Sequence, residues 1–348
     1  MSERTASYVD ALREALDQEM ERDPGVVCFG LDVDDPKAIQ GTTRGLLAKY
    51  GPERVFGTPL AEDAMTGVAI GMALAGLRPV HVHIRMDFLL LAMNQLVNIA
   101  AKASYMYGGQ VHVPIVVRSM IGKSWGQGAQ HSQGLYPLLM QIPGLRVAAP
   151  TNPHDAKGCL AAAIRDDDPV MLVEHRLLYP HRGPVPEAPY LVRPGRSRVV
   201  AEGGDVTLVG VSHALVECLR ARRYLDAVGV QAAVIDPVWL APLDVEPVAE
   251  SVARTGRLVA VDNGWTTCGA GAEIVARVVE RLDGRAVAVR RLGFAPTPCP
   301  PTPTLEELYY PDARRIAAAA FDLVEGRATG WLPEPRADAA EIEFRGPF

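Results

Sequence analysis

The feature that most constrains the fold is a repeated alternation of short apolar runs with longer segments of helical periodicity. The run VVCFGL (26–31) follows a segment in which Val9, Leu12, Leu16 and Met20 recur at helical spacing. Uninterrupted apolar runs are typical of strands buried on both faces, and the helices between them connect parallel neighbours. The sequence therefore predicts an α/β fold with mostly parallel sheets and helices on both faces.

The expected elements form two groups, separated near residue 180. In the first group we expect strands at 26–31, 54–60, 79–84, 113–119, 145–150 and 169–175, with helices at 9–20, 41–50, 64–75, 88–107 and 155–164. In the second we expect strands at 206–211, 232–236, 257–262 and 286–292, with helices that end near 228, begin near 271 and cover 313–324.

A proline-rich segment divides the two groups. Five prolines fall between residues 180 and 194, a density typical of an extended, semi-rigid linker. We therefore expect an N-terminal domain at 1–182, a linker at 183–198, a second domain at 199–328 and a loosely ordered tail at 329–348. The chain of 348 residues is long enough for two such domains.

Charge and cysteine content exclude several classes of protein. Lys and Arg number 35 and Asp and Glu 41, a net charge of −6, so we expect no nucleic-acid partner. No basic-then-apolar leader and no uninterrupted apolar span occur, and the five cysteines form no CxxC pair. We expect a soluble, cytoplasmic protein without a membrane segment.

Two residues stand where open parallel sheets bind ligands, just beyond the carboxyl ends of strands. Glu62 follows an expected strand and opens a helix, where an acid is also favoured simply by the helix dipole. His131 lies in a glycine-rich stretch, 122–134, that is long enough to be functional. By itself it could equally be a surface or structural histidine.

Two further patterns bear on assembly and cofactors. Gly67, Gly71 and Ala75 form a small-residue stripe that admits a close backbone neighbour, either within the chain or on another subunit. The chain has no phosphate-binding GxxxxGK[ST], no GxGxxG between a strand and a helix, and no GDG with paired asparagines. A diphosphate cofactor would therefore need a second chain to hold its diphosphate.

The whole chain from about residue 8 to 324 resembles a known family, the β subunits of the thiamine-diphosphate-dependent decarboxylating component of 2-oxo acid dehydrogenase complexes (pyruvate, branched-chain and acetoin types). The matching motifs are ALREALDQEMERDP, KYGPERVFGTPLAED, AGLRPV, the DF at 87–88, AQHSQ, IPGLRVAAPTNPHDAKG, AIRDDDPV and LYYPDARRIA. The resemblance implies a transketolase-type pyrimidine-binding domain and a transketolase C-terminal domain. It also implies an α₂β₂ heterotetramer, with thiamine diphosphate and Mg²⁺ held between α and β, and a lipoyl acyltransferase or acyl carrier that takes the acyl group.

The resemblance also assigns roles to residues. Glu62 falls on the glutamate that meets a ring nitrogen of the cofactor's aminopyrimidine, and Phe88 on the aromatic residue that packs on that ring. Leu60 and Ile84 occupy neighbouring cofactor contacts, and His131 matches a histidine near the bound 2-oxo acid. A structural monovalent cation, K⁺, is implied at positions corresponding to Ile115, Ala163, Ile164, Asp166 and Asp168.

Departures from the family pattern leave room for other functions. Leu31 stands where the family usually has an acid, and the strand before the DF brings in His81, His83 and Arg85. These changes could make the pocket more cationic, or the side chains could face away from the cofactor. The main prediction is a β subunit that decarboxylates a 2-oxo acid together with an α subunit. The alternatives are a split transketolase-like enzyme that transfers a ketol unit from a sugar phosphate, and a non-catalytic assembly subunit.

Overall fold

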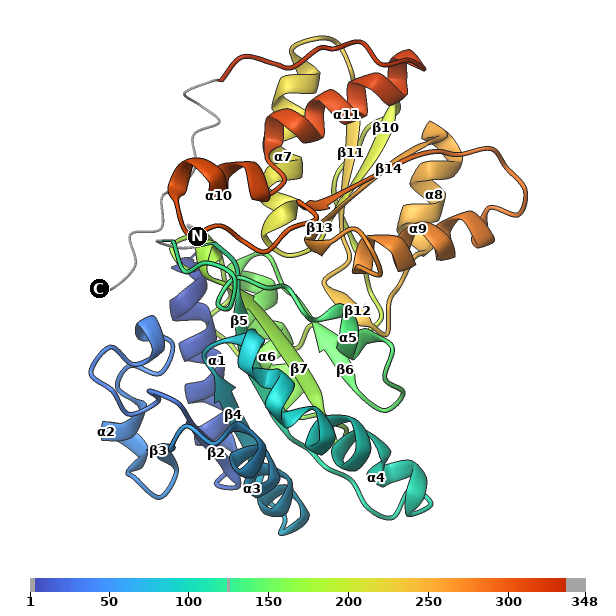
Figure 1. Cartoon of the computed structure of the whole chain (residues 1–348). Coiled ribbons are helices and arrows are strands. Elements are labelled where there is room, and N and C mark those ends of the chain that lie inside the picture. The colour runs from blue at the N-terminus through green and yellow to red at the C-terminus, as the bar shows by residue number, and fades with distance from the viewer. Residues whose placement is uncertain (1–3, 124–125, 336–348) are drawn as a thin grey trace. The chain divides into compact units, whose positions relative to one another are not determined.

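The computed structural model describes residues 4–123 and 126–335, which fall into two compact units (Figure 1). Of the described residues, unit 1 contains 4–123 and 138–194, and unit 2 contains 126–137 and 195–335. Both units are built on mostly parallel sheets, so the predicted α/β class is confirmed. The glycine-rich stretch is divided between the units, because its part from residue 126 packs with unit 2.

Unit 1 is organised around a parallel sheet. Its strands lie in the order β6, β7, β5, β4, β2, β3, and neighbouring pairs run parallel. They are β2 (Val26–Gly30), β3 (Val55–Gly57), β4 (Arg78–His83), β5 (Val116–Ile121), β6 (Arg146–Ala148) and β7 (Val170–His175). A short antiparallel pair, β1 (Thr5–Ser7) with β8 (Arg182–Pro184), lies apart from this sheet.

Helices cover both faces of the sheet. They are α1 (Tyr8–Arg22), η1 (Ile39–Gly41), α2 (Leu46–Tyr50), α3 (Glu62–Leu74), η2 (Met86–Ala92), η3 (Gln95–Ala100), α4 (Ala101–Met106), α5 (Pro137–Met140), α6 (Pro153–Ile164) and η4 (Arg176–Leu178). The helix expected at 88–107 is divided into η2, η3 and α4, of which η2 is a 3₁₀ turn and η3 a π-helix. Hydrophobic periodicity locates a helix but does not specify which backbone hydrogen bond it forms.

A buried ion pair joins two central strands of unit 1. Arg118 on β5 donates to both carboxylate oxygens of Glu174 on β7 at 2.6 and 3.0 Å, and neither side chain is exposed. The Tyr179 hydroxyl donates to the same carboxylate at 2.7 Å, and its ring stacks against Tyr8 of α1. Charge-assisted hydrogen bonds are stronger than neutral ones, and the three bonds to Glu174 hold β5 against β7 on the face that α1 covers.

Unit 2 has a smaller sheet with one antiparallel edge. Its strands lie in the order β14, β13, β10, β11, β9, and only β9 runs antiparallel. The elements of this unit are β9 (Arg198–Ala201), β10 (Val206–Gly210), α7 (His213–Asp226), β11 (Ala232–Asp236), β12 (Trp239–Ala241), α8 (Glu246–Thr255), β13 (Arg257–Trp265), α9 (Ala270–Arg281), β14 (Ala288–Phe294), α10 (Pro303–Tyr309) and α11 (Ala313–Glu325). Its core lies where α7 and α11 pack on β10, β11 and β13.

The structure describes the expected loosely ordered tail, 329–348, only up to residue 335. Trp331 packs on Phe321 of α11, with ring centroids 4.7 Å apart, and the Thr329 amide donates to Asp322 at 2.7 Å. The segment 329–335 therefore packs on α11. The rest of the expected tail, 336–348, lies outside the described residues.

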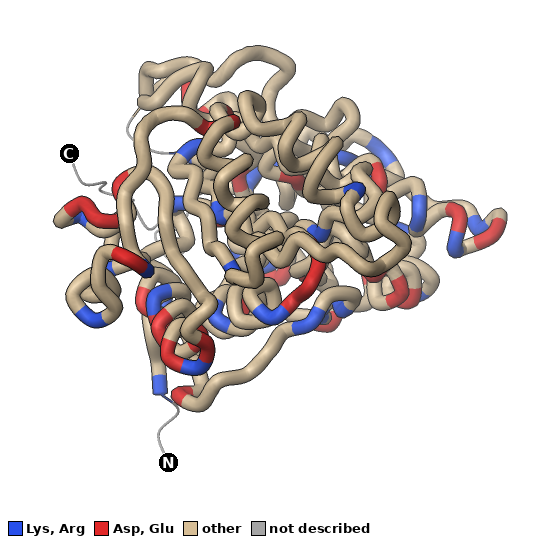
Figure 2. The backbone as a smooth tube through the Cα atoms, turned by 90° about the horizontal axis from the view of Figure 1, so that it is seen from below, with Lys and Arg blue, Asp and Glu red and all other residues tan. Residues whose placement is uncertain are grey.

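Charges of both signs are spread along the backbone of each unit. Figure 2 shows Lys and Arg interspersed with Asp and Glu rather than gathered into one basic stretch. In the part of the chain that the structure describes, no helix combines the length and apolar character that crossing a bilayer requires.

The proline-rich segment, part of the extended, semi-rigid linker predicted at 183–198, packs on unit 1 through contacts with Lys157. The Lys157 ammonium of α6 is buried and donates to the Glu14 carboxylate at 2.6 Å and to the carbonyls of Pro186 and Glu187 at 2.7 and 2.9 Å. It also lies over the Tyr190 ring at 5.3 Å. An ammonium has three donors and no acceptor, so one lysine holds α1, α6 and the start of the interdomain segment together.

We predict that Lys157→Met destabilises unit 1, because it leaves the carbonyls of Pro186 and Glu187 without the ammonium and removes one of the cations that pair with Glu14. The expected loss of unfolding free energy is about 2–4 kcal/mol. Lys49→Met is the matched control, since Lys49 donates to Asp17 at a similar 2.7 Å but is half exposed. The control should cost at most about 1 kcal/mol. Urea denaturation of both variants measures the difference, and equal losses would contradict this account.

Candidate active site

The parallel register of three strands brings distant segments to one edge of the unit 1 sheet. Gly30, the last residue of β2, pairs with Gly57 of β3 on one side and with Val82 of β4 on the other. A Cβ at Gly30 would lie 2.3 Å from the Val82 carbonyl oxygen, and the φ of Gly30 is +146°. Only glycine permits this approach. The segments that follow β3 and β4 therefore leave the same edge of the sheet, one on each side of β2.

Glu62 is the first residue of α3, at the edge just described. Its side chain is half-buried. The N-cap residue, Ala61, offers no side-chain hydrogen bond, so acidic residues alone meet the positive end of the helix dipole. The Thr66 hydroxyl donates to the Glu62 carbonyl at 2.7 Å and is itself buried. The Thr66 hydroxyl thus fixes the backbone of the first turn of α3, in which Glu62 is the first residue.

Apolar side chains predicted to contact a cofactor lie at the same edge. Leu60, in the turn between β3 and α3, is 80% exposed, and Phe88, in η2, is 36% exposed. Ile84 follows β4 directly and is half-buried. Together with Glu62 they combine one carboxylate with exposed aromatic and aliphatic surface. That donor set suits a flat heterocycle that needs one charged hydrogen bond and an apolar platform.

His131 belongs to the other unit. Its side chain is half-buried, and its amide donates to the Gly128 carbonyl at 3.4 Å in a turn of the segment 126–137. Sequence reasoning placed Glu62 and His131 in one N-terminal domain. Within the described residues the four predicted cofactor contacts share unit 1, whereas His131 packs with unit 2.

The two histidines of β4 do not favour the more cationic pocket, which is one of the two alternatives that the sequence leaves open. His81 and His83 are each only 2% exposed. Burial lowers the pKa of His81 to about 4, and burial together with the neighbouring His81 lowers the pKa of His83 well below its usual range. Both rings are therefore neutral near pH 7. They fill the space between the sheet and α3, where the His81 ring stacks on Phe29 at 4.6 Å.

His83 instead supports the helix that carries Glu62. Its Nε2 lies 3.2 Å from the Thr66 hydroxyl oxygen. Because the only hydroxyl hydrogen of Thr66 is donated to the Glu62 carbonyl, that oxygen accepts from Nε2–H. Sequence reasoning missed Thr66. The signal was present, since Thr66 is four residues after Glu62 and therefore lies one helical turn away.

Arg85 is the remaining cationic departure. Its side chain is half-buried, burial lowers its pKa, and the carboxylate of Asp87 acts in the opposite direction. Its Nη1 is buried and donates to no described residue. Leu31, at the end of β2, is half-buried and its amide donates to the Val82 carbonyl at 3.3 Å. Of the expected basic additions at this edge, only Arg85 carries charge near neutral pH.

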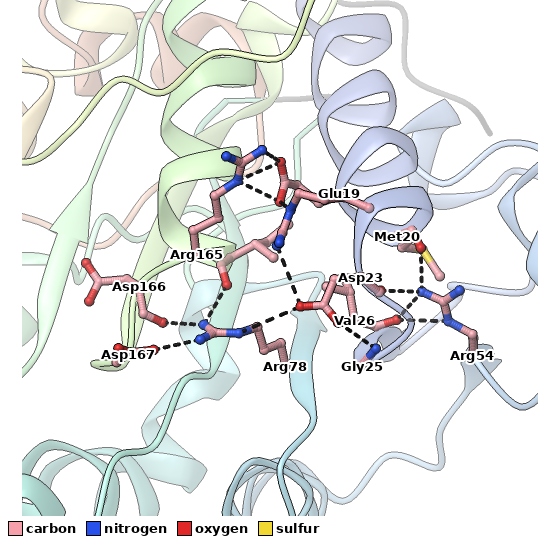
Figure 3. A network of polar contacts seen from close by, with 12 residues as sticks. Glu19, Met20, Asp23, Gly25, Val26, Arg54, Arg78, Arg165, Asp166 and Asp167 are labelled. Atoms are coloured by element: carbon pink, nitrogen blue, oxygen red, sulfur yellow. Dashed lines mark hydrogen bonds and ion pairs between the residues drawn. The ribbon is translucent and has the colours of Figure 1, made fainter.

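Two of the residues predicted to hold a monovalent cation, Ile164 and Asp166, belong to a polar network around Arg78, in which Figure 3 labels Arg78 and Asp166. Arg78 of β4 donates to the carbonyls of Ile164 and Asp166 at 3.0 and 2.9 Å, and to the Asp167 carboxylate at 2.6 Å. Figure 3 also shows that the adjacent Arg165 forms an ion pair with Glu19 of α1. Two of the predicted cation ligands thus already face a positive charge.

The other predicted cation ligands have protein partners as well. The Ile115 carbonyl accepts from the Val170 amide at 2.9 Å, and the Ala163 carbonyl accepts from the Asp166 amide at 3.2 Å. Arg146 pairs with the carboxylates of Asp166 and Asp168 at 3.1 and 2.9 Å. Among residues 4–123 and 126–335, no group of three or more His, Cys, Asp or Glu side chains is placed to hold a metal ion. The potassium site stays a prediction.

Comparison with known protein families agrees with this architecture. Residues 4–182 match the transketolase pyrimidine-binding domain, and residues 195–316 match the transketolase C-terminal domain. The solved structure of a split-gene transketolase, described as an inactive β4 tetramer, is 25% identical, with a TM-score of 0.74 over 92% of this chain and 98% of that one. Transketolase from Leishmania mexicana, at 16% identity and a TM-score of 0.67, shares the fold over 98% of this chain and 48% of its own.

Curated relatives narrow the class further. The β subunit of acetoin:2,6-dichlorophenolindophenol oxidoreductase from Cupriavidus necator is 42% identical over 93% of this chain and 98% of its own length. The mitochondrial pyruvate dehydrogenase E1 subunit β-1 from Arabidopsis thaliana is 40% identical over 89% of this chain and 87% of its own. The fold and site define a transketolase-type protein. The chain belongs to the family of β subunits found in acetoin and pyruvate dehydrogenases.

The buried histidines predict a loss of stability in weak acid. The folded chain keeps His81 neutral down to about pH 4, whereas the unfolded chain protonates it near 6.5. As the pH falls through this window the unfolded state gains protons first, so stability falls. At pH 5 one such histidine costs about 2 kcal/mol relative to pH 7.

Urea denaturation at pH 7 and pH 5 measures this loss in the wild type and in His81→Phe. The variant retains an aromatic ring beside Phe29 and should lose less stability between the two pH values. His112→Gln, at a half-exposed histidine, is the control and should behave as the wild type. An unchanged pH dependence in His81→Phe would show that His81 is not buried as a neutral ring.

Proposed function

We propose that this chain is the β subunit of a thiamine-diphosphate-dependent 2-oxo acid dehydrogenase, which decarboxylates a 2-oxo acid and passes the acyl group to a lipoyl or similar carrier. The observation that carries the proposal is the placement of Glu62 at the start of α3, beside exposed Leu60 and Phe88 at the carboxyl edge of a parallel sheet. The β-subunit relatives support it over most of the chain.

The residues of unit 1 fit the pyrimidine end of the cofactor. Phe88 and Leu60 would hold the ring, and the Glu62 carboxyl group would exchange a proton with a ring nitrogen. When bound, thiamine diphosphate supplies a nucleophilic thiazolium carbon that attacks the carbonyl of the substrate. The N-terminus of α3 stabilises the ionised form of Glu62 once its proton has moved. His131 would donate or accept a proton near the substrate.

A second chain is needed to complete the site. Gly67 and Gly71 lie on the outer face of α3, with no atom within 4 Å of the position of an added Cβ. Apolar side chains on this helix and on the elements after β4 are also exposed, namely Leu60, Val68, Leu74, Leu90, Leu91, Ile99, Tyr105 and Met106. Apolar surface of this extent marks an interaction site. We propose an α subunit as its partner, in an α₂β₂ assembly that also supplies the ligands for the Mg²⁺ diphosphate.

A split transketolase is the competing function, because one structural relative carries that description. Donor screening of the co-purified α–β pair separates the two. Pyruvate and a branched 2-oxo acid test the proposed function, and a ketose phosphate tests the alternative. Turnover of the ketose phosphate alone would contradict the proposal. A pair inactive with every donor would favour the non-catalytic assembly subunit.

We predict that Glu62→Gln slows proton exchange at the thiazolium carbon of bound cofactor by about 10²–10⁴-fold. Glutamine keeps a hydrogen bond to the ring nitrogen, but its amide cannot exchange a proton with that atom. Hydrogen–deuterium exchange of the cofactor in the assembled pair measures the effect directly.

Asp63→Asn is the matched control for this experiment. Asp63 is the next acid in the first turn of α3 and is exposed, so the variant removes the same charge from the same helix end. It should exchange at the wild-type rate. If Glu62→Gln exchanges as fast as the control, Glu62 does not activate the cofactor.

We also predict that the isolated chain binds thiamine diphosphate with Mg²⁺ only negligibly, and that binding appears with the α subunit. Gly71→Arg should leave the fold intact, because the position is open, and abolish co-purification with α. Val279→Arg, at an exposed apolar position on α9, is the control and should assemble normally. Tight, Mg²⁺-dependent binding of thiamine diphosphate to the isolated chain, measured by calorimetry, would refute the proposal that a second chain completes the site.

A further inference from the structure

The segment that carries His131 is fastened to the carboxyl edge of the unit 2 sheet. Tyr136 is completely buried, and its hydroxyl donates to Oδ1 of Asp262 on β13. The other carboxylate oxygen of Asp262 accepts from the Gly271 amide in the first turn of α9 at 3.0 Å. One buried carboxylate therefore joins β13, the start of α9 and the His131 segment.

A second contact lies two residues closer to His131. A Cβ on Gly134 would be 1.8 Å from the carbonyl oxygen of Asn263, so the segment lies directly on the β13 backbone. Asn263 is held in turn, because its side-chain amide donates to the Val211 carbonyl at 2.7 Å. A displacement of either contact would move the chain between residues 131 and 136.

The electrostatics of the pair make it a firm attachment. Burial raises the pKa of Asp262, whereas hydrogen bonds from Tyr136 and from the amides of Gly271, Ala270 and Asn263 act in the opposite direction. Burial beside the Asp262 carboxylate raises the pKa of Tyr136 well above its usual range, so the hydroxyl keeps its proton. Hydrogen bonds to a charged acceptor are about twice as strong as neutral ones.

We propose that Tyr136 and Asp262 are positioning residues for His131. The contacts of Tyr136 and Gly134, which we call the latch, hold the histidine segment in one place on unit 2. This inference rests on the proposed function in one respect, namely that His131 takes part in turnover. Tyr136 and Asp262 belong to unit 2, whereas the residues assigned to the cofactor belong to unit 1.

The first test is whether Tyr136→Phe loosens the segment. Phenylalanine keeps the ring in the core and removes only the donor to Asp262. Hydrogen exchange of the amides in 128–135, measured on this chain by mass spectrometry, should quicken by at least about tenfold. Tyr224→Phe is the control, since Tyr224 is a buried tyrosine in the core around α7 and α11. Unchanged exchange in Tyr136→Phe would overturn the latch.

The second test is a double-mutant cycle on turnover of the assembled α–β pair. Tyr136→Phe and His131→Ala should each lower turnover by at least about tenfold, and Tyr136→Phe should cause no further loss when His131 is already alanine. Proton exchange at the thiazolium carbon, which depends on Glu62, should stay at the wild-type rate in both variants. Additive losses would show that Tyr136 acts on the fold in general and not through His131.

Gly134→Ala provides an independent variant if Tyr136→Phe folds poorly. The added Cβ displaces the same segment through the Asn263 carbonyl, and the variant still has the Tyr136 hydroxyl group. It should reproduce both the faster exchange and the non-additive loss of turnover. Full turnover of His131→Ala would refute the proposed role of His131, whereas the exchange experiment would still decide whether the latch exists.

Discussion

The close approach of Gly30 to the Val82 backbone is the constraint on which the candidate site depends. It brings the carboxyl end of β2 against those of β3 and β4, so the turn before α3 and the segment before η2 leave the sheet together. Any side chain at Gly30 would force these strands apart. Separation would part Glu62 from Phe88, which are 26 residues apart in the sequence. The chemistry of this edge is therefore fixed by backbone packing before any functional side chain is considered.

The same edge shows how a buried sheet can carry polar residues without adding charge. His81 and His83 are polar in composition, but burial keeps their rings neutral, and His83 serves as a donor to Thr66 below Glu62. Arg118 and Glu174, on the opposite face of the sheet, are joined by two hydrogen bonds between the guanidinium and both carboxylate oxygens. Polar side chains inside this domain thus hold backbone elements in place, and the Glu62 carboxylate lies at the N-terminal end of α3.

The residues proposed to act in cofactor activation and in substrate proton transfer belong to different compact units. Unit 1 presents the pyrimidine contacts, and unit 2 holds the histidine segment through Tyr136 and Gly134. Exposed apolar surface on α3 and the elements after β4 supports a partner chain as the third contributor. Such a division lets cofactor activation and substrate proton transfer be altered independently. It also explains why the proposed tests separate effects on Glu62 from effects on His131.

The sequence by itself determined the α/β class, the two-domain organisation and the positions of Glu62 and Phe88, because periodicity and strand ends are local properties of the chain. Specific motifs were enough to predict the family. Only the tertiary structure decided that the histidines of β4 are neutral, that Lys157 fixes the proline-rich segment to unit 1, and that residues 126–137 pack with unit 2. Each of these depends on burial or on partners distant in sequence, such as Asp262 for Tyr136. Burial and long-range pairing are set by how elements pack, which no local pattern contains.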